Sequence, residues 1–282
     1  MGAKLLAVDL DGTLLDSSGR PHEGDVRALR AALAEGVRVS IVTGRLYSGT
    51  RPTAERVGLR GVLGCADGSH VVRAHDHATL LHHGVSGDDA RRMRAAFARQ
   101  EVATFVFADD AIGHDALGAP FVDYVSTWSP DVRPATDVFR HELWDTAAGV
   151  TAVVAVGSEA QVRGVVGDLH EGMRDAVMAV AFPLRKGAHA GRWGTIVRSA
   201  RGTKGTALAW IARHEGIGIE DTVCVGDWVN DVPMFEVAGR SFAMGQAPPE
   251  VKAKATDVLD ETAETGGGVA RVVARAFGIR PG

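Results

Sequence analysis

The sequence predicts an α/β protein: a parallel β-sheet with helices on its faces, interrupted by an inserted α+β segment. At both ends of the chain, short apolar runs alternate with amphipathic stretches of about 10–15 residues, a pattern typical of βαβ units. In the middle, helical and strand-like stretches mix without this alternation. The chain has 282 residues and exceeds a typical single domain of roughly 100–150 residues, so one large domain or two domains are expected.

The two ends of the chain supply the elements of the predicted sheet. At both ends, strands are expected at the apolar or β-branched runs, and helices at the stretches with helical apolar spacing. The expected strands are 5–8, 37–42, 61–65, 222–225 and 241–244. The expected helices are 23–35, 48–57, 203–213, 230–237 and 268–277. We therefore predict that residues 1–81 and 196–282 form one core.

The middle segment, residues 82–195, is predicted to be an inserted α+β domain. Its strand pairs do not need crossover connections, unlike those of a parallel sheet. Clusters with glycine bracket it, at His82-His83-Gly84 and at Lys186-Gly187-Ala188-His189, and we expect hinges there. The expected helices are 87–100 and 159–169, and the expected strands are 103–107, 151–156 and 177–182.

Composition narrows the class of protein. Apolar residues make up 45% and charged residues 23%, as in ordinary globular proteins, and the net charge is −4. A general nucleic-acid or membrane-surface binder would show a basic face, so neither partner is expected. Cys65 and Cys224 lack CxxC spacing and are expected to be buried thiols. With neither a signal peptide nor a long apolar run in view, a cytoplasmic enzyme is expected; the oligomeric state stays open.

An acidic pair follows the first strand. The sequence from Leu5 to Thr13 is L-L-A-V-D-L-D-G-T, so an apolar run leads directly into Asp9 and Asp11. Alternation along a strand would point both carboxylates the same way. Like charges held so close are unfavourable unless a cation lies between them.

Polar residues also follow three other predicted elements. Thr43 and Gly44 come after the second strand, where a hydroxyl and backbone N–H groups suit a phosphate oxygen. Lys204 opens a helix, a position that favours an acid unless an anion lies opposite. The sequence G-D-W-V-N-D, which contains Asp227, Asn230 and Asp231, follows a third strand.

These segments are expected to meet in one pocket. In a parallel sheet the carboxyl ends of all strands lie at one edge, where ligands bind. A cluster of hard oxygen ligands there suits Mg²⁺, which accepts a few carboxylates and keeps waters or phosphate oxygens as its other ligands. The predicted members are Asp9, Asp11, Thr43, Lys204, Asp227 and Asn230.

Taken together, the four motifs resemble those of the haloacid dehalogenase superfamily: D-x-D-G-T, then T-G-R, then K-G, then G-D-x-x-N-D. An insert between the second and third motifs is similar to the type IIB cap of Cof-like phosphatases. The ending A-M-G-Q-A at 243–247 is also similar to that group. This resemblance implies a Rossmann-like core and a Mg²⁺-dependent phosphatase of small phosphomonoesters, such as sugar phosphates or phosphorylated cofactors.

The resemblance also implies a role for each residue. Asp9 would be the nucleophile that forms an aspartyl-phosphate, and Asp11 would be the acid–base group. The Asp9 carboxylate, the Asp11 backbone carbonyl and Asp227 would hold Mg²⁺. The remaining groups would bind the phosphate or orient its ligands: Thr43, Gly44, Lys204 and Asn230 would grip phosphate oxygens, and Asp231 would orient Lys204 or a metal-bound water.

Other residues are open candidates for substrate contact. Arg45 follows Gly44 but is also a common surface salt-bridge former. Asp67-Gly68-Ser69 stands where the resembled group usually has Asn-Gly-Ala, and Gln246 stands in place of an Asn. Both departures bear on substrate identity and not on the chemistry. The histidines near 75–83 fit no standard zinc spacing and favour a polar hairpin.

Two rival functions remain at this point. A phosphosugar mutase of the same superfamily would share every catalytic residue. A phospho-aspartate receiver would also use an aspartate at a strand end with Mg²⁺, Thr and Lys. The adjacent Asp9 and Asp11 and the large insert argue against a receiver.

Overall fold

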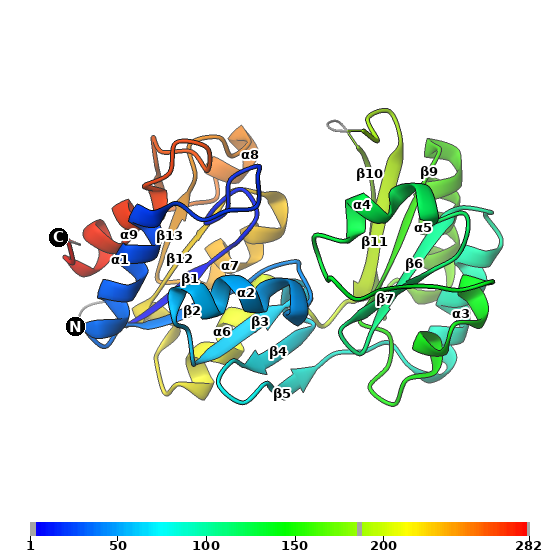
Figure 1. The fold of residues 1–282 in the computed structure, drawn as a ribbon, viewed down its shortest axis with the longest axis horizontal. Coiled ribbons are helices and arrows are strands. Elements are labelled where there is room, and N and C mark those ends of the chain that lie inside the picture. The colour runs from blue at the N-terminus through cyan, green and yellow to red at the C-terminus, as the bar shows by residue number, and fades with distance from the viewer. Residues whose placement is uncertain (1–3, 185–187, 281–282) are drawn as a thin grey trace. The chain divides into compact units, whose positions relative to one another are not determined.

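A computed structural model describes residues 4–184 and 188–280. The chain forms two compact units. The first, here called the core unit, comprises Met1–Gly44, Thr50–Leu81 and Thr203–Gly282. The second, here called the insert unit, comprises Arg45–Gly49 and His82–Gly202. Figure 1 shows the elements of both.

The core unit is built on a five-stranded sheet in which every neighbouring pair is parallel. Its strand order is β14-β13-β12-β1-β2. Leu5 at the start of β1 pairs with Thr222 on one side and with Arg38 on the other, so β12, β1 and β2 start in register. The strands are β1 (Leu5–Val8), β2 (Arg38–Ile41), β12 (Thr222–Gly226), β13 (Arg240–Ala243) and β14 (Asp257–Val258). The predicted α/β class with a parallel core sheet is confirmed.

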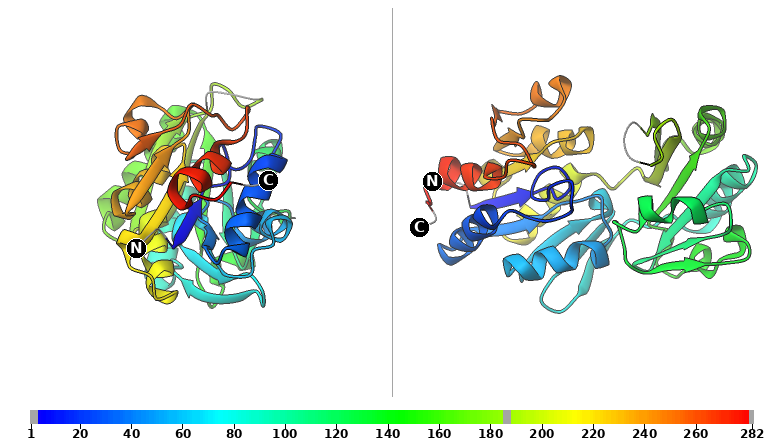
Figure 2. Two further views of the ribbon diagram at one scale, coloured as in Figure 1. Left: turned by 90° about the vertical axis from the view of Figure 1, so that its left-hand side faces the viewer. Right: turned by 45° about the horizontal axis from the view of Figure 1, so that its top comes forward.

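Helices pack on this sheet. Side chains of α6 (Lys204–His214) and α7 (Val232–Val237) share a buried apolar cluster with Leu5 and Cys224. Helices α1 (Glu23–Ala34) and α9 (Gly268–Phe277) contact each other and reach β2 and β12, as Figures 1 and 2 show. The remaining helices of this region are α2 (Tyr47–Val57) and α8 (Pro249–Lys252).

Two predictions at the edges of the core unit need refinement. The helix expected over 230–237 begins only at Val232, after a 3₁₀ turn over Val229–Asp231. Pro233 lacks a backbone N–H and fits only the first turn of an α-helix, so the helix cannot start earlier with Pro233 in its interior. The strand expected over 61–65 forms as β3 (Val62–Cys65), but it belongs to a separate small sheet in the order β3-β4-β5 and not to the parallel sheet. The histidine segment supplies its other two strands, β4 (His70–Arg73) and β5 (Ala78–His82).

The insert unit contains a six-stranded sheet in the order β10-β11-β9-β6-β7-β8. Its pairs are antiparallel except for β7 with β8. The strands are β6 (Ala103–Ala108), β7 (Ala111–His114), β8 (Val132–Pro134), β9 (Ala152–Gly157), β10 (Val177–Pro183) and β11 (Trp193–Ser199). The helices are α3 (Gly87–Ala98), α4 (Val122–Val125) and α5 (Glu159–Met173).

The predicted boundary at residue 195 falls inside β11. This strand pairs with β10 over its whole length and with β9 from Trp193 to Arg198, and therefore belongs to the sheet of the insert unit. Of the two expected hinges, Lys186-Gly187 lies outside the described residues. Across residues 4–184 and 188–280, none of the helices combines the length and the apolar character needed to cross a membrane.

Candidate active site

The parallel register brings three predicted site residues to one edge of the core sheet. Asp9 directly follows β1, Thr43 lies two residues after β2, and Asp227 directly follows β12. The Asp9 N–H donates to the carbonyl of Val225 at 3.0 Å, so the pairing of β1 with β12 continues into the site. Asp9 and Thr43 are buried.

Lys204 lies at the centre of the acidic residues. A reciprocal pair of hydrogen bonds between Thr203 and Thr206 starts α6, and this capping box makes Lys204 the first helical residue. The Lys204 ammonium is buried, with Nζ 2.6 Å from Asp9 Oδ1 and 2.6 Å from Asp231 Oδ1. The anion expected opposite this helix start is thus a pair of carboxylates.

Asp231 is a connecting group. One of its oxygens accepts from Lys204, and the other accepts from the backbone N–H groups of Asp227 at 2.8 Å and Trp228 at 2.9 Å. A Cβ on Gly226 would lie 2.3 Å from Asp231 Cγ, so only glycine lets the strand end approach this carboxylate. Asp231 therefore fixes both the lysine and the backbone that carries Asp227, and the predicted contact with Lys204 is present.

Burial and mutual charge shift the acids. Burial, followed by the charge of Asp231, raises the pKa of Asp9 well above its ordinary value, although Lys204 opposes this shift. Burial and Asp231 likewise raise the pKa of Asp227 to about 6. Burial alone would lower the pKa of Lys204, but the carboxylates of Asp231 and Asp9 raise it. Lys204 therefore stays positively charged, and a second cation would stabilise the ionised forms of Asp9 and Asp227.

The acidic oxygens are close enough to share that second cation. One carboxylate oxygen each from Asp9, Asp227 and Asp231 lies within 4.8 Å of the others. A Cβ on Gly12, where φ is +80°, would lie 2.4 Å from Asp227 Oδ2, so the loop after β1 closes tightly over this carboxylate. The oxygen donors suit a hard divalent cation. Because Asp231 already accepts three hydrogen bonds, Asp9 and Asp227 are the carboxylates that fit it best.

Two residues hold Asp227 from the side. Thr13 donates from Oγ1 to Asp227 Oδ1 at 3.4 Å, and Gln246 donates from Nε2 to Asp227 Oδ2 at 3.3 Å. The Gln246 amide also donates to the carbonyl of Gly12 and accepts from the N–H of Ala263. Sequence reasoning assigned Thr13 no role and linked Gln246 only to substrate identity, whereas both side chains contact Asp227.

Asn230 and Asp67 form a second polar pair at the site. Asn230 Nδ2 donates to Asp67 Oδ1 at 2.8 Å, and the Asp67 N–H donates to the carbonyl of Thr43 at 2.8 Å. The carboxylate of Asp67 faces Gly44, since a Cβ there would lie 3.5 Å from Asp67 Oδ1. Thr43, Gly44, Asn230 and Asp67 are therefore neighbours within the core unit.

Asp11 and Arg45 complete the set of predicted site residues. Asp11 is exposed. Asp11 is expected to bind the metal through its backbone carbonyl, and the cluster of side-chain oxygens does not test that expectation. Arg45 belongs to the insert unit, where its Nη1 donates to the carbonyl of Gly49 at 3.4 Å.

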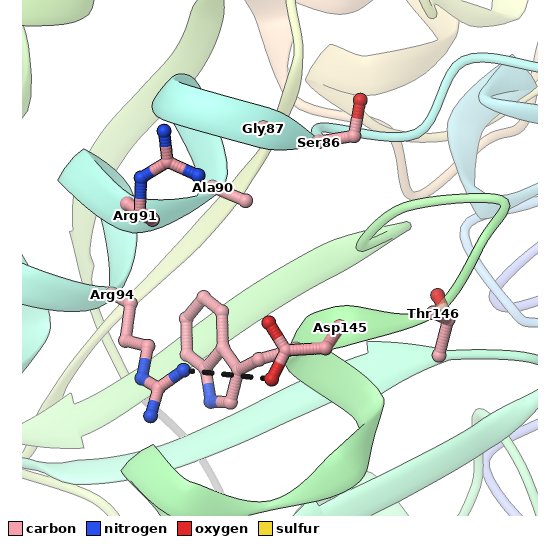
Figure 3. Close-up of a pocket in the computed structure, with 8 residues that line it drawn as sticks. Ser86, Gly87, Ala90, Arg91, Arg94, Asp145 and Thr146 are labelled. Atoms are coloured by element: carbon pink, nitrogen blue, oxygen red, sulfur yellow. Dashed lines mark ion pairs between the residues drawn. The ribbon is translucent and has the colours of Figure 1, made fainter.

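A separate pocket lies within the insert unit. It has a volume of about 290 Å³ and is lined by residues of α3, including Arg91 and Arg94, together with Trp144. Figure 3 shows the guanidinium of Arg94 directed toward Asp145, with 3.8 Å between Nη1 and Oδ2. None of the predicted catalytic residues lines this pocket.

Comparisons with known proteins show which family and fold the chain resembles. The family model of the haloacid dehalogenase-like hydrolases matches residues 6–141 and 186–273. Phosphatase YwpJ of Bacillus subtilis is 27% identical over 90% of this chain and 94% of its own length. Pyridoxal phosphate phosphatase YbhA of Escherichia coli is 25% identical over 93% and 94%. A haloacid dehalogenase-like hydrolase of Bacteroides thetaiotaomicron superimposes with a TM-score of 0.83 at 19% identity, covering 98% of this chain and 100% of that one.

Proposed function

This chain belongs to the haloacid dehalogenase-like hydrolase family and is a phosphatase of that family, and we propose that it hydrolyses small phosphomonoesters with Mg²⁺ through an aspartyl-phosphate on Asp9. The observation that carries the proposal is the buried Lys204, which contacts Asp9 and Asp231 at 2.6 Å each beside Asp227. An aspartate held by a permanent cation at the carboxyl edge of a parallel sheet is suited to attack a phosphoryl group.

Asp9 is the nucleophile in this proposal. A carboxylate oxygen of Asp9 forms a bond to phosphorus while the bond from phosphorus to the ester oxygen breaks. Asp11 gives its proton to the departing oxygen. Asp11 then takes a proton from the water that attacks the same phosphorus, which releases phosphate and restores the Asp9 carboxylate. Burial raises the pKa of Asp9, and the contact with Lys204 opposes that rise, so the lysine favours the ionised nucleophile.

The other side chains bind and orient. Four groups would bind the phosphoryl oxygens: the side chains of Lys204, Asn230 and Thr43 and the N–H of Gly44. Asp231 holds Lys204 in place. The carboxylates of Asp9 and Asp227 and the backbone carbonyl of Asp11 would hold Mg²⁺. When bound, the ion neutralises charge on the phosphoryl oxygens.

We also propose that the insert unit selects the substrate. The groups assigned to bond making and breaking all lie in the core unit, so the insert unit is left to contact the leaving group and exclude water. Sugar phosphates and phosphorylated cofactors are the substrate classes that fit a family of small-molecule phosphatases. Of the two expected hinges, His83-Gly84 opens the insert unit and would absorb the backbone rotation.

A phosphate-release screen over a broad panel of phosphomonoesters tests the proposal. We expect hydrolysis of several esters with Mg²⁺ and loss of turnover in excess chelator. Products are also checked for isomerised phosphates, because a mutase would return the phosphoryl group to the substrate. Full turnover in chelator would contradict the metal requirement, and phosphate transfer without release would contradict the hydrolase assignment.

A further inference from the structure

We propose that Asp67 is a positioning residue that orients the Asn230 amide toward the phosphate and whose own charge keeps phosphate binding weak. The inference rests on the proposed function, because it takes Gly44 and Asn230 to be phosphate-binding groups. It concerns the affinity of the site, which the family assignment does not determine.

The position of Asp67 is set by its backbone. Its φ of +52° and ψ of +31° lie in the left-handed region, and its N–H is held by the carbonyl of Thr43 at 2.8 Å. The side chain is buried, with 5% of the residue exposed. A carboxylate held this firmly cannot turn to solvent when a phosphate arrives.

The Asp67 carboxylate is next to groups that would bind phosphate. Asp67 Oδ1 accepts from Asn230 Nδ2 at 2.8 Å, and it lies 3.5 Å from the place a Cβ would occupy on Gly44. Asp67 is also among the acids that act on Lys204, after Asp231 and Asp9. A fixed negative charge therefore stands beside three predicted phosphate ligands.

This placement has two opposite effects. An amide nitrogen carries two hydrogens, so by accepting one of them Asp67 presents the amino end of Asn230, and not its carbonyl, to the phosphate. The negative charge at the same time repels the phosphate, and in a buried site this repulsion is stronger than in water. We infer that the second effect dominates the affinity and that it speeds release of the phosphate product.

Asp67→Asn separates the effects. Asparagine tolerates left-handed backbone and keeps an oxygen that can accept from Asn230, so the variant removes the charge and retains the geometry. Asp67→Ala removes both the charge and the acceptor. Asp76→Asn is the matched control, because it removes one carboxylate from the exposed β4–β5 turn, where Asp76 pairs with Arg73.

Binding of inorganic phosphate to the full-length chain in saturating Mg²⁺ is measured by calorimetry for the unmodified protein and the three variants. We expect Asp67→Asn to bind phosphate about tenfold more tightly, Asp67→Ala to bind less tightly than Asp67→Asn, and Asp76→Asn to be unchanged. KM for every phosphomonoester should fall with Asp67→Asn by a similar factor, while kcat does not rise.

The proposal is overturned if Asp67→Asn tightens phosphate binding by less than threefold, or if this variant binds no phosphate at all. The orienting role alone is overturned if Asp67→Ala binds as tightly as Asp67→Asn. A chain that hydrolyses no ester in the screen refutes the proposed phosphatase instead, because the phosphate isotherm does not depend on turnover. Hydrolysis with an unchanged isotherm refutes only the role of Asp67.

Discussion

Replacing Lys204 with methionine should destabilise the metal-free protein by about 3–5 kcal/mol, the usual loss when one partner of a buried ion pair is removed. The lysine side chain is 1% exposed, and its partners Asp9 and Asp231 are 6% and 0% exposed, so water cannot replace the lost contacts. Methionine fills most of the same volume, which keeps the cavity contribution small. The loss therefore reports charge and not packing.

The pH dependence follows from the raised carboxyl pKa values. Lys204 lowers the pKa of Asp9 and of Asp227, so its removal raises both further. A carboxyl whose pKa is higher in the folded state than in the unfolded state binds its proton more tightly when the protein is folded. The fold therefore loses stability as the pH rises above the unfolded-state pKa, and regains it as the pH falls and the group binds a proton. The loss should thus be largest near pH 8 and smaller near pH 5.

Urea denaturation at both pH values measures the effect. Lys254→Met is the control, since Lys254 forms an exposed ion pair with Glu236 at 3.4 Å and should change stability by less than about 0.5 kcal/mol. The electrostatic reasoning is refuted if Lys204→Met costs under about 1 kcal/mol at pH 8, or if the loss is the same at pH 5.

Three further predictions test other parts of the structure. Affinity for Mg²⁺ should fall as the pH drops below about 6, because protons compete with the ion for Asp227 and Asp9. The expected loss is roughly tenfold per pH unit for each proton displaced, and equal calorimetric affinities at pH 5 and 7.5 would contradict it. Asp25→Ala should lower the free energy of unfolding by about 1–2 kcal/mol in urea denaturation. The buried carboxylate of Asp25 accepts from the N–H groups of Gly267 at 2.9 Å and Ala270 at 2.7 Å at the start of α9. A loss below about 0.5 kcal/mol would show that Asp25 does not cap this helix. Substitutions in the insert unit should change KM and the ranking of substrates more than turnover of a small generic phosphoester, and a scan that left the ranking intact would refute its role in specificity.

The core elements could be read from the sequence because their signals are local. Helix α9 was predicted at its observed bounds, since the small residues at its start and the spacing of Val269, Val272 and Val273 define one buried face. In contrast, β11 was missed in the insert. It contains Gly194, which weakens the local strand signal. It is stabilised by pairing with β9 and β10, which a local pattern does not reveal.

The site was predictable as a set of residues but not as a set of contacts. Strand ends in a parallel sheet meet at one edge, so the approach of Asp9 to Asp227 follows from topology. The contact between Asn230 and Asp67 depends on the left-handed backbone of Asp67, and the contact of Gln246 with Asp227 depends on the path of a C-terminal loop. Neither follows from spacing in the sequence.

The most direct test of the central claim is to trap the phosphorylated enzyme. Asp11→Asn should slow hydrolysis of the intermediate yet still permit phosphorylation by p-nitrophenyl phosphate, because nitrophenolate leaves without a proton. Mass spectrometry of this variant after rapid quenching should find one phosphoryl group on the peptide that contains Asp9, and the added substitution Asp9→Asn should abolish it. A phosphoryl group on another residue, or a double variant that is phosphorylated as before, would contradict Asp9 as the nucleophile.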